Sequence, residues 1–274
     1  MRVPSRLVLL GHPVAHSFSP AMQNAALASA GIPASYSAED VEPGRLQATL
    51  AALALEGAAG NITIPHKERA NRLMGRLSPI ASRVGATNTF FTAEEGELVG
   101  HNTDVAGFAE LVQSTTGSTP SAARFAVIGA GGSAAAVLAA IEMWDGCSAI
   151  VYARNAARAA SLASRFAAVT RTQSMTDGQW LDGDIVVNAT PVGLNNDEFP
   201  APLSSISIDA IVLDLVCRSG DTPWVRAARD SGRVASGGFP MLVGQGAAAF
   251  EAWFGVQPDR EAMWRGLKLA MDIA

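Results

Sequence analysis

The segment of residues 61–67 (NITIPHK) brings polar and cationic side chains together at the end of an expected strand. Side chains alternate between the two faces of a strand, so Asn61 and Thr63 should point one way and the two isoleucines into a core. Pro65 cannot continue a central strand but suits the first turn of a helix. Lys67 should therefore lie just past the carboxyl end of a strand, where open α/β sheets bind their ligands.

Asp104, the last residue of the sequence Asn102-Thr103-Asp104, is the carboxylate that we expect beside Lys67. A lysine, an aspartate and amide or hydroxyl donors in one crevice suggest proton transfer on a hydroxylated small molecule. A simple Lys–Asp ion pair with a structural role remains an alternative at this point.

Composition excludes several classes of protein. A chain of 274 residues is long enough for two domains. Its net charge of -5 argues against a nucleic-acid surface, which needs clustered Lys and Arg. No apolar run reaches the roughly 18 residues of a membrane span, and the N-terminus reads as a first strand rather than a signal peptide. We therefore expect no nucleic-acid and no membrane partner.

The thiols and imidazoles do not form a metal motif. Cys147 and Cys217 form neither a metal-like pair nor a disulfide framework. The four histidines lack the usual spacing of metal ligands. We expect a soluble, reduced, cytoplasmic protein without a metal site.

Strands alternate with helices along the whole chain, which predicts an α/β fold with mostly parallel sheets covered on both faces. The expected strands are 6–11, 34–41, 59–64, 87–92, 97–101, 125–128, 148–153, 184–188 and 210–215, and the expected helices include 20–30, 43–56, one from Pro65, one from Ser78, one from Thr103, and 240–254 and 259–273. Gly117-Ser118-Thr119-Pro120 reads as the connection into a second domain.

We expect two domains. Residues 1–103 should form a substrate-binding catalytic domain, and residues 104–238 a Rossmann-type dinucleotide-binding domain. The C-terminal helices, residues 239–274, should pack back on the first domain.

A glycine-rich turn, GAGGSA, directly follows the expected buried strand 125–128 and opens a helix. This strand–turn–helix setting is the context that a dinucleotide fingerprint requires. Gly129 and Gly131 permit a tight turn and a close backbone approach, and the helix N-terminus offers N–H groups to a pyrophosphate. Ala134 takes the place of the third glycine. A glycine-rich turn of an ordinary βαβ unit is the alternative.

Two arginines follow the second strand of that domain. Arg154 stands where an acidic residue would bind the ribose 2′-hydroxyl of NAD, and Arg158 lies one helical turn later. Two guanidinium groups in this arrangement suit a 2′-phosphate, so we favour NADP. A solvated helix face would also place both arginines there.

Hydroxyl and amide side chains elsewhere could complete a binding site. In residues 16–20 (HSFSP), Ser19 reads as a helix N-cap and Pro20 as the first helical residue, and Ser17 and Ser19 together could hold an anion. Capping alone would also explain Ser19. Gln245 lies on an otherwise apolar helix, where a buried amide needs a partner such as a ligand. A surface-facing Gln245 is equally compatible with the sequence.

Seven segments, taken together, resemble the shikimate dehydrogenase family over nearly the whole chain. They are HSFSP (16–20), GNITIPHK (60–67), GATNT (85–89), NTD (102–104), GAGGSA (129–134), NATPVG (188–193) and GFPMLVGQ (238–245). The resemblance implies the reversible reduction of 3-dehydroshikimate to shikimate with NADPH, a step toward chorismate and the aromatic amino acids. A monomer or a homodimer is expected.

The resemblance also implies roles for individual residues. Lys67 and Asp104 would be the catalytic pair. The substrate would be bound by Ser17, Ser19, Asn61, Thr63, Lys67, Asn88, Asp104 and Gln245. The cofactor would be bound by Gly129, Ala130, Gly131, Gly132, Ser133, Ala134, Arg154, Asn155, Arg158, Thr190 and Gly238.

One departure from the family keeps the substrate open. The family commonly has a Tyr that reaches the substrate carboxylate where this chain has Cys217, and a thiol is a weak, short donor. A related enzyme acting on quinate or an amino-shikimate is therefore an alternative. A non-catalytic dinucleotide or metabolite sensor on the same scaffold is a second one.

Overall fold

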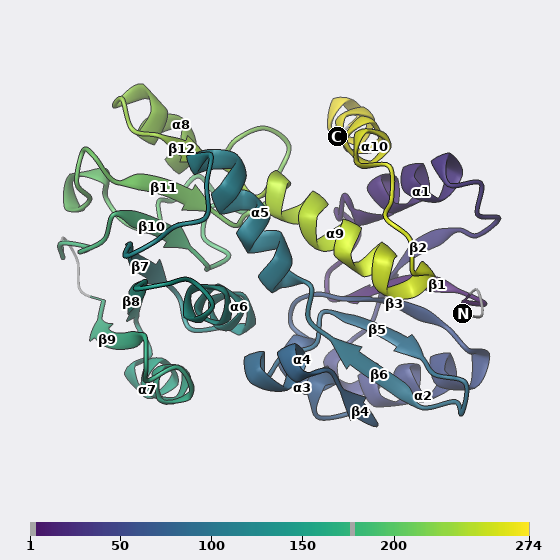
Figure 1. The fold of residues 1–274 in the computed structure, drawn as a ribbon. Helices are drawn as coiled ribbons and strands as arrows, with labels where there is room; N and C mark the ends of the chain where they lie inside the picture. The colour runs from purple at the N-terminus through teal and green to yellow at the C-terminus, as the bar shows by residue number, and fades with distance from the viewer. Residues whose placement is uncertain (1–3, 176–178, 274) are drawn as a thin grey trace. The chain divides into compact units, whose positions relative to one another are not determined.

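The structure is a computed structural model that describes residues 4–175 and 179–273 (Figure 1). The described residues form two compact units. The first unit contains the residues up to Thr103 together with those from Val243 onward, and the second contains the residues from Asp104 to Leu242.

The first unit is built on a mixed sheet. Its strands are β1 (Leu7–Gly11), β2 (Tyr36–Asp40), β3 (Ala59–Ile62), β4 (Arg76–Leu77), β5 (Thr89–Thr92) and β6 (Leu98–His101), in the order β2-β1-β3-β5-β6-β4. Only β5 runs antiparallel to its neighbours β3 and β6. The carboxyl ends of β1, β3 and β6 and the beginning of β5 therefore meet at one edge of the sheet.

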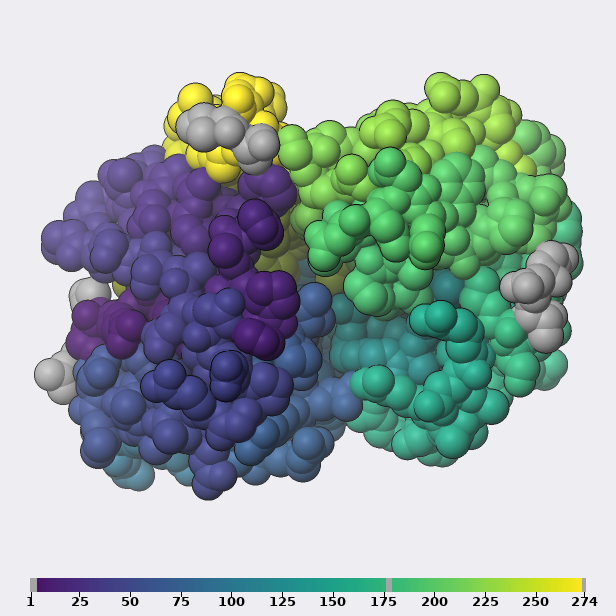
Figure 2. Space-filling model, turned by 180° about the vertical axis from the view of Figure 1, so that it is seen from behind, coloured from purple at the N-terminus to yellow at the C-terminus, as the bar shows by residue number. Residues whose placement is uncertain are grey.

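Helices cover this sheet and join distant parts of the chain. They are α1 (Ser19–Ser29), α2 (Leu46–Glu56, preceded by the 3-10 turn Pro43–Arg45), α3 (Lys67–Asn71), α4 (Pro79–Val84) and α10 (Arg260–Ile273); α9 spans Phe239–Phe254. Figure 2 shows the C-terminal residues (yellow) against the N-terminal residues (purple). A Cβ on Gly266 of α10 would lie 2.6 Å from the carbonyl oxygen of Ala21 in α1, so the two helices pack closely.

The second unit contains a fully parallel sheet. Its strands are β7 (Arg124–Ile128), β8 (Ser148–Ala153), β9 (Thr170–Ser174), β10 (Ile185–Asn188), β11 (Ile211–Asp214) and β12 (Ala235–Ser236), in the order β12-β11-β10-β7-β8-β9. Its helices are α5 (Asp104–Thr116), α6 (Gly132–Glu142), α7 (Ala156–Arg165) and α8 (Pro223–Asp230), with a 3-10 turn at Leu203–Ser205. The strand order reverses between β7 and β10, as in dinucleotide-binding sheets. The expected α/β fold class is confirmed.

Each unit has its own apolar core. In the first unit, Val8, Leu10 and Phe90 of the sheet pack with Leu46 and Leu50 of α2. In the second unit, the largest fully buried side chain is that of Trp224, whose indole N–H donates to the carbonyl of Ala201 at 3.0 Å. Burial of these side chains positions the strand ends that carry the polar residues.

The local predictions for residues 63–67 are wrong. Strand β3 ends at Ile62, and the helix begins at Lys67 rather than at Pro65, because the N–H of His66 donates to the carbonyl of Thr63 and closes a turn. Since the strand alternation stops there, Ile64 does not enter the core and is 49% exposed.

The start of α1 also differs from the prediction. Ser19 is the first helical residue and not the N-cap, which is Phe18. The hydroxyl of Ser17, two residues earlier, instead accepts a hydrogen bond from the N–H of Ser19 at 3.2 Å.

In the part of the chain that the structure describes, no helix is both long and apolar enough to cross a membrane.

Candidate functional site

A cluster of buried polar side chains lies at the edge of the first sheet where β3 and β6 end and β5 begins. We call it the polar edge, and its members are Asn61, Asn88, Thr89, Asn102 and Thr103. Buried polar groups are costly unless they are hydrogen-bonded, so their partners determine what the cluster can do.

Asn88 is the centre of the polar edge. Its Oδ1 accepts a 2.7 Å hydrogen bond from the N–H of Thr103, and its Nδ2 donates to the Thr103 hydroxyl at 3.0 Å. Thr103 directly precedes Asp104, which is 4% exposed and begins α5. Asn88 therefore fixes the backbone that presents Asp104.

Both the nitrogen and the oxygen of the Asn61 amide form hydrogen bonds with other residues of the protein. Its Nδ2 donates to the carbonyl of Asn88 at 3.2 Å and to the hydroxyl of Thr89 at 2.9 Å, and its Oδ1 accepts from the phenol of Tyr36 at 2.8 Å. Burial raises the pKa of Tyr36 well above its ordinary value of 10.0, so the phenol remains a donor. The structure thus gives Asn61 an architectural role, and its contact with a substrate stays a prediction.

Lys67 enters this region from the turn after β3. It is half-buried at the start of α3, and its carbonyl accepts a 3.0 Å hydrogen bond from the N–H of Thr87, beside Asn88. Thr63, on the same segment, is anchored through its N–H to the carbonyl of Leu10 at 2.8 Å. Backbone bonds therefore fix this segment beside the polar edge, and the pairing of Lys67 with Asp104 stays a prediction.

His101 closes the end of β6. Its Nδ1 lies 2.8 Å from the hydroxyl of Ser78, which also caps α4 by accepting from the N–H of Ala81. Burial lowers the pKa of His101 below its ordinary value of 6.5, so the neutral imidazole is favoured next to the polar edge.

The remaining predicted substrate residues lie on α1, α9 and the segment before α1. Gln245 is 8% exposed, so the surface-facing alternative is wrong. Its neighbour Gly246 accepts a 2.9 Å hydrogen bond from Nε2 of the buried Gln23, which ties α9 to α1. Ser19 is buried and Ser17 partly exposed.

In the second unit, the glycine-rich turn has the geometry that a pyrophosphate requires. Gly129 has φ +116°, and a Cβ there would lie 3.0 Å from the carbonyl oxygen of Ala189. Gly131 caps α6 with open space where a Cβ would be, and Ala134 is fully buried. These residues fit a dinucleotide, because the free helix N-terminus can donate N–H groups to phosphate oxygens. The helix macrodipole adds to this attraction.

The predicted 2′-phosphate residues follow β8. Arg154 lies between β8 and α7 and Arg158 lies in the first turn of α7, and both are exposed. Asn155 is the N-cap of α7, and its Oδ1 accepts from the N–H of Arg158 at 2.9 Å. The side chain of Asn155 therefore orients the turn that carries the two arginines.

A buried network links the ends of β10 and β11. Asp214 is fully buried and accepts hydrogen bonds from Nδ2 of Asn188 at 2.8 Å and from the hydroxyl of Thr222 at 2.7 Å. Burial raises the pKa of Asp214 above its ordinary value of 3.8, and the hydrogen bonds from these donors partly offset the rise. This network was not predicted from the sequence. Three polar residues could have indicated it: Asn188 and Asp214 at the ends of two buried strands, and Thr222 before Pro223.

Two further predicted cofactor residues adjoin this network. The hydroxyl of Thr190 donates to Oδ1 of Asn188 at 2.6 Å. A Cβ on Gly238 would lie 2.6 Å from the carbonyl oxygen of Leu215 and 2.8 Å from Sγ of Cys217, so this position admits only glycine. Contacts of both residues with a cofactor stay predictions.

No group of three His, Cys, Asp or Glu side chains that could hold a metal ion occurs within residues 4–175 and 179–273.

Full-length relatives cover both units, whereas the two family models match mainly the first. The substrate-binding domain model of shikimate dehydrogenase matches residues 9–90, and the C-terminal domain model of shikimate 5′-dehydrogenase matches residues 238–268. The chain is 38% identical over 268 residues to the NADP(+) shikimate dehydrogenase of Symbiobacterium thermophilum, covering 93% of this chain and 90% of the relative.

Solved structures agree with the sequence comparison. Shikimate 5-dehydrogenase of Thermus thermophilus, crystallised with NADP(H) and shikimate, is 36% identical with a TM-score of 0.86, covering 97% of this chain and 99% of that one. Quinate dehydrogenase of Corynebacterium glutamicum, in complex with NAD, is 27% identical with a TM-score of 0.84, covering 96% and 98%. The chain belongs to the shikimate dehydrogenase family.

Proposed function

We propose that this protein catalyses the reversible, NADPH-dependent reduction of 3-dehydroshikimate to shikimate. The observation that carries the proposal is Lys67 beside the polar edge, on a segment that the substrate-binding domain model matches. The full-length similarity to NADP(+)-dependent shikimate dehydrogenases supports the same reaction.

Lys67 is suited to the proton transfer because of its chemical type. The sequence has 20 Lys and Arg residues, and only Lys67 and Lys268 among them are lysines. An ammonium group can give up a proton, whereas a guanidinium group stays charged in proteins. We assign Lys67 the delivery of the proton to the alkoxide that develops as the ring carbonyl is reduced, and Asp104 the orientation of that lysine and of a substrate hydroxyl.

Residues of the second unit would hold the cofactor. When bound, NADPH supplies the hydride. The N–H groups at the start of α6 would bind the pyrophosphate, with Gly129 and Gly131 allowing its approach. Arg154 and Arg158 would bind the 2′-phosphate and favour NADP over NAD.

A panel assay tests the proposal directly. The purified protein is incubated with NADP and, in turn, shikimate, quinate and a simple cyclohexene alcohol, and the absorbance of NADPH is followed. We expect the highest kcat/KM with shikimate and a clear preference for NADP over NAD. Binding of both ligands without any turnover would contradict the proposal and favour a sensor.

Quinate is a second candidate substrate because of one residue. Cys217, at the loop after β11, offers a weak, short thiol donor where the family commonly has Tyr. A kcat/KM for quinate above that for shikimate would establish this alternative. In that case Cys217→Tyr should shift the ratio of the two constants toward shikimate.

The location and assembly of the enzyme are part of the proposal. Cys147 and Cys217 are both free cysteines, which suits a reducing compartment such as the cytoplasm. We propose a monomer or homodimer, which light scattering coupled to gel filtration would distinguish from larger assemblies.

A further inference from the structure

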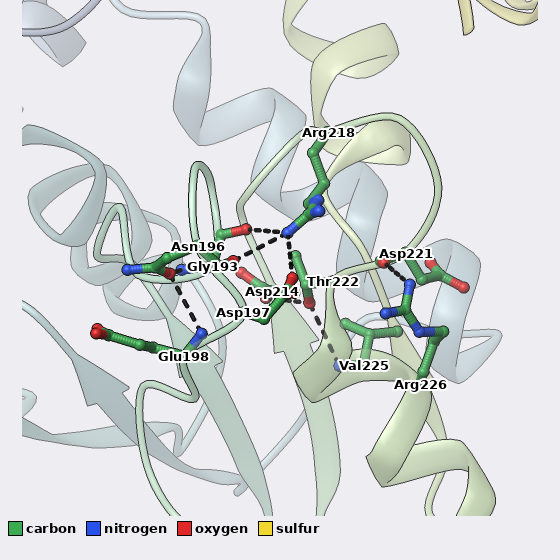
Figure 3. A network of polar contacts seen from close by, with 10 residues as sticks. All are labelled: Gly193, Asn196, Asp197, Glu198, Asp214, Arg218, Asp221, Thr222, Val225 and Arg226. Atoms are coloured by element: carbon green, nitrogen blue, oxygen red, sulfur yellow. Dashed lines mark hydrogen bonds and ion pairs between the residues drawn. The ribbon is translucent and has the colours of Figure 1, made fainter. Parts of the chain in front are cut away.

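Two loops of the second unit are joined by a single arginine. The β10 loop, residues 189–199, follows β10, and the β11 loop, residues 215–222, follows β11. Arg218 of the β11 loop reaches across to the β10 loop, as Figure 3 shows.

The contacts of Arg218 converge on one nitrogen. Its Nη1 donates to the carbonyl of Gly193 at 3.0 Å, to the carbonyl of Asn196 at 3.0 Å and to Oδ1 of Asp197 at 3.2 Å. A neutral side chain of similar length carries no positive charge that could attract three oxygen atoms at once.

The two carbonyls matter more than the carboxylate. The side chain of Asp197 is 79% exposed, whereas that of Arg218 is 30% exposed. An ion pair with such an exposed partner contributes little, because water and salt screen it. The hydrogen bonds to the backbone of Gly193 and Asn196 therefore set the position of the β10 loop.

Each of the two loops is braced by hydrogen bonds of its own. In the β10 loop, Oδ1 of Asn196 accepts from the N–H of Gly193 at 2.9 Å and from that of Glu198 at 3.3 Å. In the β11 loop, Thr222 donates to Asp214 and accepts from the N–H of Val225 (Figure 3). Arg218 thus connects two internally braced loops and fixes their spacing.

The strand order shows which half of a dinucleotide these loops face. The glycine-rich turn follows β7, and the arginines suited to the 2′-phosphate follow β8, on one side of the reversal point. β10 and β11 lie on the other side. A dinucleotide bound across the reversal point extends its adenosine half over β8 and its other half over the loops after β10 and β11.

We propose that Arg218 is a positioning residue for the nicotinamide half of the cofactor. By fixing the β10 loop against the β11 loop, it sets the surface on which the nicotinamide rests and thereby its alignment for hydride transfer. This inference rests on the proposed NADP-dependent function.

The decisive experiment separates the two halves of the cofactor. Dissociation constants of NADPH and of 2′,5′-ADP, which lacks the nicotinamide, are measured by fluorescence or calorimetry for wild type, Arg218→Gln and Arg218→Lys. Steady-state kinetics and the deuterium isotope effect with labelled shikimate are measured on the same variants.

We expect Arg218→Gln to lower kcat/KM for NADPH by about tenfold or more, as for the loss of a charge-assisted hydrogen bond. Its affinity for 2′,5′-ADP and the preference for NADP over NAD should not change. The isotope effect should rise as hydride transfer becomes slower. Arg218→Lys should recover part of the loss, since an ammonium can still bond one carbonyl.

Arg226→Gln is the matched control. Arg226 is an exposed arginine of α8 that bonds only the carbonyl of Asp221 in Figure 3 and does not reach the β10 loop, so this variant should behave as wild type.

Equal losses of NADPH and 2′,5′-ADP affinity in Arg218→Gln, or no loss at all, would overturn the inference. An inactive wild type that still binds NADPH would instead contradict the proposed function and leave the binding comparison intact.

Discussion

Asn88 holds the N–H of Thr103 in a 2.7 Å hydrogen bond, so a side chain just before β5 fixes the residue that precedes Asp104. The resemblance to the family implied a substrate contact for Asn88. The structure adds a positioning role that does not depend on any ligand, because both amide atoms of Asn88 bond Thr103.

Replacement of Asn88 by Ala should destabilise the protein and slow the reaction. The buried N–H of Thr103 would lose its acceptor, which costs about 1–3 kcal/mol in the free energy of unfolding. Urea denaturation and kcat are the measurements. Asn195→Ala, at an exposed asparagine, is the control and should change stability by less than about 0.5 kcal/mol. Equal stabilities of the two variants would contradict the positioning role.

Tyr36→Phe should destabilise the protein more than Tyr152→Phe does. Tyr36 donates to the buried Oδ1 of Asn61 at 2.8 Å, and its loss leaves that acceptor without a donor, at a cost of about 1–3 kcal/mol. Tyr152 is also buried, but it accepts from the backbone N–H of Asp182, a residue exposed at the surface, so we expect water to reach this N–H when the hydroxyl is removed. Thermal and urea unfolding of both variants check the order, and the reverse order would be inconsistent with the network of the polar edge.

Gly129→Ala and Gly131→Ala should separate folding from cofactor binding. At φ +116°, with the carbonyl oxygen of Ala189 at 3.0 Å, an alanine at position 129 is strained by about 1–3 kcal/mol, so both stability and NADPH affinity should fall. Position 131 has open space, so its variant should fold normally and lose only NADPH affinity. Normal NADPH binding by a stable Gly131→Ala protein would argue against the assigned pyrophosphate site.

Acid should destabilise the protein through His101. Burial lowers the pKa of His101 in the folded state below 6.5, so the unfolded chain takes up a proton first as the pH falls. Stability contributed by the neutral imidazole is therefore complete above about pH 6.5 and is lost as the pH falls toward the lowered pKa. Melting temperatures are measured between about pH 5 and 8, the range in which histidine titrates. As the pH is lowered, they should fall less steeply for His101→Gln than for wild type. Identical slopes would rule out this contribution.

Regular elements with a strong local signal could be predicted from the sequence. The end of the expected helix 43–56 and the strand pair 87–92 and 97–101 agree with α2, β5 and β6. Gly57 and Gly96, which follow α2 and join β5 to β6, adopt the positive φ that favours glycine. The glycine-rich turn was recognisable for the same reason, since Gly129 follows a buried strand.

Features that depend on tertiary contacts could not be predicted. Strand β9 is polar and mostly exposed at the edge of its sheet, so it lacks an apolar pattern. The hydrogen bonds of Asn61 join residues 25 to 28 positions apart, and those of Arg218 join residues 21 to 25 apart. Motif matching names such residues but does not show whether they face a ligand or brace another residue.

The proposed function depends above all on proton transfer by Lys67, which is measured by kcat for shikimate oxidation in Lys67 variants. We predict that Lys67→Ala lowers kcat by about 10² or more, the range of general acid–base catalysis, with far less change in shikimate affinity. Lys67→Arg should not restore kcat, because a guanidinium keeps the positive charge but does not give up a proton near neutral pH. Lys268→Ala, at the other lysine, exposed on α10, should match wild type. A wild-type kcat in Lys67→Ala would contradict the role of Lys67 in proton transfer.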